Sequence, residues 1–145
     1  MKFKMLGDYF NGSFNNDYPS KDNLIERECP ANTDEILYKM IVSYKHLGSV
    51  VESAHDGFYK WRSLSLEDRI SFLKRYQDEV KKVKSDIAEA ISLETGKPLW
   101  EATGEAQSVI GKVDVTINEG LKRIAKKSFP EIMPGTQGEL YYKPL

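Results

Sequence analysis

The most informative stretch of this chain is Glu94-Thr95-Gly96-Lys97-Pro98-Leu99-Trp100-Glu101-Ala102-Thr103-Gly104-Glu105. Gly96 stands where a helix ends, a place that favours a residue with positive φ, and glycine adopts that conformation at no steric cost. Pro98 suits the first turn of a new helix, because its fixed φ is helical and its missing N–H is not needed there. The stretch therefore predicts a joint between one helix that ends before Gly96 and a longer helix that begins near Pro98.

Three shorter helices are predicted before this joint, because apolar residues recur there at spacings of three and four. The first begins at about His46, Ser65 is the expected N-cap of the second, and Ser85 or Asp86 caps the third. The expected inward faces are Val50, Val51, Ala54, Phe58 and Trp61 in the first helix; Leu66, Ile70, Leu73, Tyr76 or Gln77, Val80 and Val83 in the second; and Ile87, Ala90, Ile91 and Leu93 in the third.

The fourth helix is predicted to run from about Pro98 to Lys126. Three glycines inside it each lower its stability by about 1 kcal/mol relative to alanine. Close approach of another element is the usual reason for such glycines, so we expect tight packing at those points. The glycines are Gly104, Gly111 and Gly120, and the expected apolar stripe is Ala106, Val109 or Ile110, Val113, Ile117, Leu121 and Ile124.

The first forty or so residues are predicted to be extended. Asn11-Gly12 is the dipeptide most typical of a tight hairpin turn, and it follows a candidate strand from Phe3 to Phe10. Further strands are expected over Leu24–Glu28 and Glu35–Ser43, on either side of a turn that spans Cys29–Asp34. A last strand is expected at the C-terminal end, over Glu139–Lys143.

Composition excludes several classes of protein. The 145 residues are enough for one domain, and 21 basic residues nearly balance 22 acidic ones, so nothing attracts nucleic acid or an anionic membrane over long range. The single cysteine excludes an internal disulfide and a multi-cysteine metal site. The N-terminus lacks the apolar run of a signal peptide, and we expect a cytoplasmic protein.

Candidate catalytic groups are few. Cys29 is the obvious nucleophile to consider, but no partner that would lower its pKa is visible, and a structural role is the simpler interpretation. Glu101 and Glu105 lie four residues apart on one helix face, where they could serve acid–base chemistry or bind a hard cation. Acids are also expected in the first turns of a helix for electrostatic reasons alone, and a structural role is the simpler interpretation. Glu94 could reach across the glycine turn toward Lys97 or toward the free amide groups of the next helix, which is a structural role. His46 and His55 are nine residues apart in the sequence, a spacing that does not predict a shared metal ion.

A series of motifs resembles the N-terminal part of the aldehyde dehydrogenase superfamily. The likeness covers the chain from about Phe3 to Leu145, and it departs from the family at Cys29, where an asparagine is usual. In order, the motifs are Asn11-Gly12, Cys29-Pro30-Ala31-Asn32-Thr33-Asp34-Glu35-Ile36-Leu37, Phe58 with Trp61, Arg69 with Leu73, Ile87-Ala88, Glu94-Thr95-Gly96-Lys97-Pro98, Glu101-Ala102 with Glu105, and Tyr142-Lys143-Pro144-Leu145.

Within the superfamily, three segments are most similar to succinylglutamate-semialdehyde dehydrogenases, which act in arginine catabolism: Lys97–Ala102, Ile110–Val113 and Thr116-Ile117. The resemblance implies that a cysteine thiolate attacks the aldehyde, that hydride passes to NAD or NADP, and that a glutamate-activated water releases the acid. In the family, those groups lie downstream of the part matched here. The resemblance therefore assigns no catalytic, cofactor-binding or metal-binding residue to this chain, and Cys29 does not match the family's nucleophile.

The resemblance also implies an α/β fold with an N-terminal β-hairpin and strand, four helices and a C-terminal β-strand. Residues 1–44 would be an N-terminal β arm, residues 45–127 a helical layer of the cofactor-binding domain, and residues 128–145 the truncated start of the oligomerisation or bridging strands.

Because the catalytic and cofactor motifs are expected beyond Leu145, we expect this chain alone to be inactive and to bind no cofactor, with NAD or NADP serving the full-length member. Expected partners are a second copy or the remainder of the enzyme, with no nucleic acid and no membrane. The alternative is a stand-alone, non-catalytic interaction or oligomerisation module.

Overall fold

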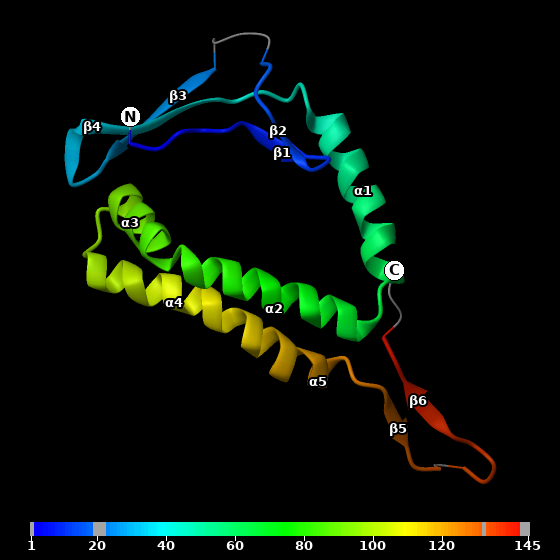
Figure 1. Cartoon of the computed structure of the whole chain (residues 1–145). Helices are drawn as coiled ribbons and strands as arrows, with labels where there is room; N and C mark the ends of the chain where they lie inside the picture. The colour runs from blue at the N-terminus through cyan, green and yellow to red at the C-terminus, as the bar shows by residue number, and fades with distance from the viewer. Residues whose placement is uncertain (1, 19–22, 132, 143–145) are drawn as a thin grey trace.

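The computed structural model describes residues 2–18, 23–131 and 133–142 (Figure 1). Its elements, in chain order, are β1 (Asp8–Phe10), β2 (Ser13–Asn15), β3 (Leu24–Cys29), β4 (Asn32–Ile41), α1 (Leu47–Ser63), α2 (Leu66–Lys82), α3 (Lys84–Thr95), α4 (Leu99–Val115), the π-helical turn η1 (Thr116–Gly120), α5 (Leu121–Arg123), β5 (Lys127–Phe129) and β6 (Gly138–Leu140). The predicted α/β class is confirmed, and the strands form three separate two-stranded antiparallel sheets.

The predicted hairpin at Asn11-Gly12 is present and joins β1 to β2. Asn11 has a φ of 50° and Gly12 a φ of 77°, and positive φ at both central residues is what a tight hairpin turn requires. The first strand is shorter than predicted, since β-pairing begins only at Asp8. The segment before it lies on β4 instead, where the N–H groups of Lys2 and Phe3 donate to the carbonyl of Leu37 at 2.9 and 2.8 Å.

Strands β3 and β4 form the longest pairing of the described chain, from Leu24 opposite Ile41 to Cys29 opposite Asn32. The predicted turn over Cys29–Asp34 was too long. The chain reverses at Pro30-Ala31 alone, so pairing resumes at Asn32. Leu37 in β4 is completely buried.

Ser65 caps α2 as predicted, and its Oγ accepts a hydrogen bond from the N–H of Asp68 at 3.0 Å. The predicted caps of α3 were wrong. Only Val83 separates α2 from α3, so Ser85 and Asp86 lie inside the first turn of α3 and neither caps it. Gly96 ends α3 in the left-handed conformation with a φ of 73°, as predicted.

The long final helix starts at Leu99, just after Pro98, but is not uniform to Lys126. After α4 it passes into the π-helical turn η1 and the short α5, and helical structure ends at Arg123. In the structure, α2 and α4 run side by side with α3 at one end of the pair (Figure 1). The central cluster of this packing is made of three alanines, Ala88, Ala102 and Ala106, with Ile87 and Ile91 packed against them.

The structure settles two ambiguous inward positions. Gln77, not Tyr76, is buried on α2, and its amide donates to the carbonyl of Ile110 at 3.0 Å and to Oδ2 of Asp114 at 2.7 Å. On α4, Ile110 is 5% exposed whereas Val109 is 40% exposed. The amide of Gln77 fits between α2 and α4 because each of the two hydrogens on its nitrogen has an acceptor on α4.

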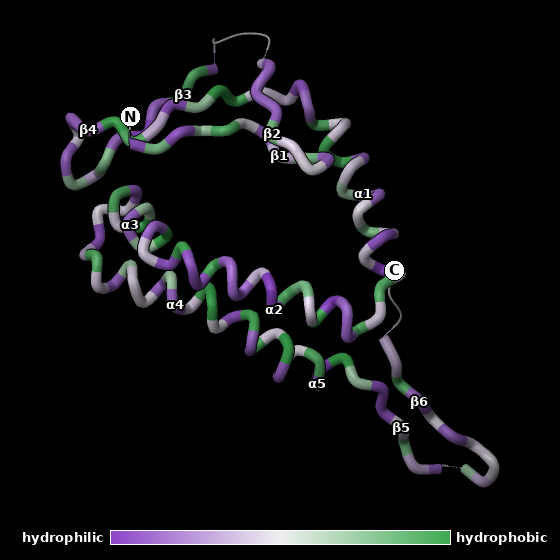
Figure 2. Tube along the Cα trace, viewed as in Figure 1, coloured by the Kyte–Doolittle hydropathy of each residue, from purple (hydrophilic) through white to green (hydrophobic). Residues whose placement is uncertain are grey.

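Helix α1 differs from its prediction. Figure 2 shows hydrophobic and hydrophilic residues alternating along it, as an amphipathic helix requires, yet none of its side chains is buried. Val51 remains 59% exposed and Trp61 remains 40% exposed. The helix contacts β1 on one side, where the N–H of Asn11 donates to Ser53 Oγ at 3.2 Å.

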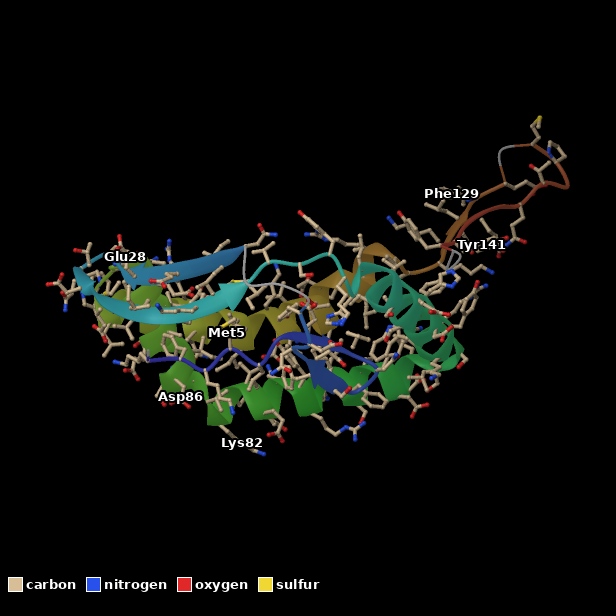
Figure 3. The ribbon with its side chains drawn as sticks, turned by 90° about the horizontal axis from the view of Figure 1, so that it is seen from above. Met5, Glu28, Lys82, Asp86, Phe129 and Tyr141 are labelled. Atoms are coloured by element: carbon tan, nitrogen blue, oxygen red, sulfur yellow. The ribbon has the colours of Figure 1, made fainter. Side chains whose placement is uncertain are left out.

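Hairpin β5–β6 extends beyond the helices, as Figure 3 shows for its labelled residues Phe129 and Tyr141. The predicted strand Glu139–Lys143 is observed over Gly138–Leu140, and Lys143 lies outside the described residues. None of the helices in residues 2–18, 23–131 and 133–142 combines the length and apolar character needed to cross a bilayer.

The expectation of close approach at the helical glycines was wrong. A Cβ placed at Gly104 or Gly111 meets no atom of the described chain within 4 Å outside the helix's own backbone, and one placed at Gly120 only approaches the carbonyl oxygen of Val115 at 4.0 Å. Close approaches occur at glycines outside the helices: a Cβ would overlap the carbonyl oxygen of Asn15 at Gly7, and would lie 3.3 Å from the Cβ of Pro30 at Gly96.

These two environments predict opposite effects of the same substitution. Gly96→Ala is expected to destabilise the fold by about 1–2 kcal/mol, because a left-handed conformation is unfavourable for alanine. Gly104→Ala, in an exposed and open part of α4, is expected to stabilise it by about 1 kcal/mol. Urea denaturation followed by circular dichroism measures both variants. Equal effects of the two substitutions would contradict the assignment of Gly96 as the joint.

Candidate functional site

The turn at Gly96 is held against hairpin β3–β4 by polar contacts. Arg27, on β3, donates from Nη2 to the carbonyl oxygen of Glu94 at 2.8 Å. Tyr38, on β4, forms a hydrogen bond with the Glu94 side chain, which is the first cause of a raised pKa of the tyrosine. Ser92 closes the turn from within, since its hydroxyl donates to the carbonyl of Lys97 at 2.7 Å. Glu94 therefore serves as an acceptor at the joint.

Glu101 and Glu105 share one cation. The Nζ atom of Lys97 lies 3.5 Å from Glu101 Oε1 and closer still to Glu105 Oε1. The hydrogen bond to Glu105 is the largest cause of a raised pKa of Lys97. Both carboxylates are therefore already paired with the ammonium group of Lys97, which favours the structural interpretation of this acidic pair over a cation site.

Cys29 lies at the end of β3 and is 3% exposed. A nucleophile must be reached by its substrate, and this thiol is covered at the edge of the joint. The strand is irregular here, with register shifts on either side of Glu28, so strict alternation does not relate Arg27 to Cys29. The guanidinium of Arg27 contacts the Glu94 carbonyl instead.

The most strongly organised polar cluster is one that sequence reasoning did not find. His46, just before α1, is 8% exposed and lies between two carboxylates. Its Nδ1 is 2.8 Å from Asp8 Oδ2, and its Nε2 is 2.7 Å from Asp17 Oδ1. Lys45 adds a second cation, with Nζ 2.7 Å from the carbonyl oxygen of Asp17. The cluster therefore attaches the hairpin β1–β2 to the start of α1.

Two aromatic rings pack near the imidazole of His46, and its carboxylate neighbours favour the protonated form of the ring. The rings of Phe10 and Tyr18 lie 5.5 and 5.6 Å from the imidazole, between centroids. The hydrogen bond to Asp8 and that to Asp17 raise the pKa of His46 against the opposing effect of desolvation. Hydrogen bonds from Lys45 and His46 lower the pKa of Asp17, and desolvation raises the pKa of Tyr18.

This arrangement has a chemical consequence. A histidine acting as a general base needs a free ring nitrogen, and both nitrogens of His46 are engaged by carboxylates. A pocket of about 280 Å³ adjoins the cluster and is lined by Asp8 and Tyr18 together with Met5, Gly7 and the β4 residues Lys39 and Met40. The cluster is thus suited to holding the N-terminal segment, and it carries no nucleophile.

His55, the other histidine, stacks edge-on against Tyr59 at 5.0 Å and takes no part in the cluster. Within the described residues, no group of three or more His, Cys, Asp or Glu side chains is arranged to hold a metal ion. Sequence reasoning missed the cluster because Asp8, Asp17 and His46 belong to three segments with no common spacing.

The cluster predicts a pH-dependent contribution to stability. The folded pKa of His46 is raised above 6.5, so its contribution is complete below pH 6.5 and is lost as the pH rises through the folded value. The folded pKa of Asp17 is lowered below 3.8, so its contribution is complete above pH 3.8 and is lost as the pH falls through the folded value. The stabilisation is therefore greatest between these limits.

We expect His46→Gln to lower the melting temperature more at about pH 5.5 than at about pH 8.5, because only the protonated ring donates to both carboxylates. His55→Gln, which removes the histidine outside the cluster, is the matched control. Melting curves by circular dichroism provide the measurement. A pH-independent effect of His46→Gln would show that the charge of the ring contributes nothing.

Comparison with known proteins agrees with this architecture. The sequence model of the aldehyde dehydrogenase family matches residues 18–145. An N-succinylglutamate 5-semialdehyde dehydrogenase from Chromobacterium violaceum is 30% identical over 115 residues, which are 79% of this chain and 23% of that protein. The chain thus spans less than a quarter of the length of this relative.

Solved structures show the same fold. A succinate-semialdehyde dehydrogenase from Burkholderia pseudomallei is 28% identical, with a TM-score of 0.71 over 86% of this chain and 25% of that one. An NADP-dependent glyceraldehyde-3-phosphate dehydrogenase from Bacillus halodurans, solved with NADP, is 22% identical with a TM-score of 0.67, over 79% of this chain and 24% of that one. Since the family's sequence pattern extends over most of the residues and the fold agrees with that of solved members, the chain belongs to the aldehyde dehydrogenase family.

Proposed function

We propose that this chain contributes the N-terminal part of an NAD(P)-dependent aldehyde dehydrogenase that oxidises N-succinylglutamate semialdehyde to the carboxylate, in arginine catabolism. The observation that carries the proposal is the 30% identity, over 79% of the chain, to a protein named for that activity. The Lys97–Ala102 stretch at the start of α4, which suggested this subfamily, belongs to the joint that positions α4.

In this proposal, the 145 residues act as a scaffold and do not turn over substrate alone. The thiol of Cys29 is buried and both ring nitrogens of His46 are engaged. NAD(P) requires a cradle of backbone N–H groups for its phosphates. The sequence has no Gly-x-Gly-x-x-Gly, which supports the proposal that these residues do not hold the cofactor by themselves.

The experiment is a comparison of two preparations. The native gene product, isolated from its own cells with an antibody against this region, is expected to reduce NAD or NADP when given N-succinylglutamate semialdehyde, with a lower kcat/KM for succinate semialdehyde. The purified 145-residue chain, assayed at the same concentration, is expected to show no reduction. Absorbance of the reduced nicotinamide is the readout.

Three outcomes contradict the proposal, each in a different part. Turnover by the purified 145-residue chain contradicts its role as a scaffold. Failure of the native product to oxidise any aldehyde contradicts the dehydrogenase function. Oxidation of succinate semialdehyde in preference to the succinylglutamate derivative would leave the family activity intact but refute the proposed substrate.

A second candidate function, a non-catalytic oligomerisation module, is favoured by one feature. Hairpin β5–β6 extends beyond the helices and is followed by two aromatic side chains, Tyr141 and Tyr142, that are 64% and 60% exposed. Exposed strand edges with apolar side chains promote pairing between copies.

For this candidate we expect the chain to sediment as an oligomer and the double substitution of Tyr141→Lys with Tyr142→Lys to shift it toward monomer, because charge on an exposed edge opposes pairing. Tyr44→Lys, at a residue 80% exposed and remote in sequence, is the control and should leave the oligomer intact. Sedimentation velocity measures all three proteins. A monomer at about 100 μM of the unsubstituted chain would rule this function out.

A further inference from the structure

Arg69 on α2 carries an unsatisfied donor. Its Nε atom is buried and has no hydrogen-bond partner. No ion pair with Arg69 is present in the part of the chain that the structure describes. Buried polar groups almost always find a partner, and an exception calls for an explanation such as a missing ligand. A guanidinium N–H without an acceptor is therefore the feature to explain.

The same arginine lines a pocket of about 200 Å³ between α2 and the segment η1–α5. Trp61, from the last turn of α1, also lines this pocket. The second polar side chain of the lining, Thr116, is already engaged, since its hydroxyl donates to the carbonyl of Lys112 at 2.8 Å. The remaining lining is aliphatic: Leu66, Ile70 and Leu73 from α2, and Ile117, Leu121 and Ile124 from the opposite wall.

The opposite wall has an unusual backbone. Thr116 and Ile117 belong to the π-helical turn η1, which interrupts the helix between α4 and α5. Such turns are rare and are frequent at functional sites. The aliphatic wall, the unpaired Nε of Arg69 and the π-helical turn are three independent features, and they coincide at one pocket.

These features specify the chemistry of a ligand. The Nε and Nη groups of arginine form a planar fork that matches a carboxylate. An aliphatic lining selects a hydrocarbon body. A cavity of about 150 Å³ holds benzene, so a pocket of this size has room for a body of roughly six to eight carbons and not for a nucleotide.

We propose that this pocket binds a free monocarboxylate with a short apolar body, its carboxylate on the Nε edge of Arg69 and its hydrocarbon among the aliphatic side chains of α2 and η1–α5. The inference does not rest on the proposed dehydrogenase function, because every residue it uses belongs to the described helices. It adds a ligand site to a chain in which none was predicted.

The test uses octanoate as the probe and Trp61 as the reporter. The chain has two tryptophans, and Trp100 is 76% exposed on α4, so Trp100→Phe leaves Trp61 as the sole tryptophan. Titration with octanoate, below its micellar range, is expected to change the Trp61 emission and to saturate. Octanol, which has the body without the charge, and acetate, which has the charge without the body, should each bind at least about tenfold more weakly.

A pair of arginine variants separates the site from general electrostatics. Arg69→Gln is expected to raise the dissociation constant of octanoate about tenfold or more, since it removes the charged fork. Arg75→Gln is the matched control on the same helix, because the Arg75 guanidinium stacks over Phe72 at 4.2 Å and does not line the pocket. It should bind octanoate as the parent does. Circular dichroism verifies that both variants are folded.

Three results would overturn the proposal. Octanol binding as tightly as octanoate would show that the carboxylate contributes nothing to the affinity. Equal weakening of octanoate binding by Arg69→Gln and Arg75→Gln would show that the net charge of the chain, and not the Arg69 fork, attracts the ligand. The third is loss of octanoate binding at concentrations where sedimentation shows that the chain associates, together with an association that Arg69→Gln prevents. That result would assign the pocket to a carboxylate of a second copy.

Discussion

The contact between the Gly96 turn and the tip of hairpin β3–β4 is the constraint on which the rest of the structure depends. Gly96 adopts a φ of 73°, and the absence of a side chain lets the turn approach Pro30 and Ala31 closely. Arg27 adds a hydrogen bond from β3 to the carbonyl of Glu94. This contact sets the direction in which α4 leaves the turn, and it joins the only large sheet pairing of the described chain to the helices. Without it, the β-hairpin and the helical layer would share few interactions.

The direction of α4 in turn determines the kind of core the molecule has. Three alanines at the crossing of α3 and α4 let the two backbones approach, so the core is tight but contains little apolar volume. Large apolar side chains therefore remain on the outer faces, as at Phe72, which is 46% exposed, and at Trp61. In other proteins, large contiguous apolar patches on the surface mark sites of contact with a partner or a ligand. The relatives, of which this chain spans about a quarter, have much more chain available for such contacts.

Two polar side chains, His46, which is buried, and Arg69, whose Nε atom is buried, show opposite outcomes of desolvation. His46 is enclosed by acceptors, so both ring nitrogens are satisfied and the charge of the ring is stabilised by its two carboxylates. Arg69 has a buried Nε with no acceptor, although it lines a pocket with aliphatic walls. Desolvation is unfavourable in both places, and hydrogen bonding offsets it in one of them. The satisfied cluster attaches the first hairpin to α1, and the unsatisfied donor marks the place where a ligand's carboxylate is proposed to bind.

Features that depend on neighbours within a few residues were readable in the sequence. The Asn11-Gly12 turn, the Ser65 cap and the end of α3 at Gly96 follow from the conformational preferences of those residues, which act locally. Family membership was readable too, from the order of such local motifs. The choice of Gln77 over Tyr76, the open space around Gly104, the π-helical turn and the meeting of Asp8, Asp17 and His46 were not. Each of these depends on which distant segments come together in space, and a single sequence carries no periodic signal for a contact between segments that pack only after the chain has folded.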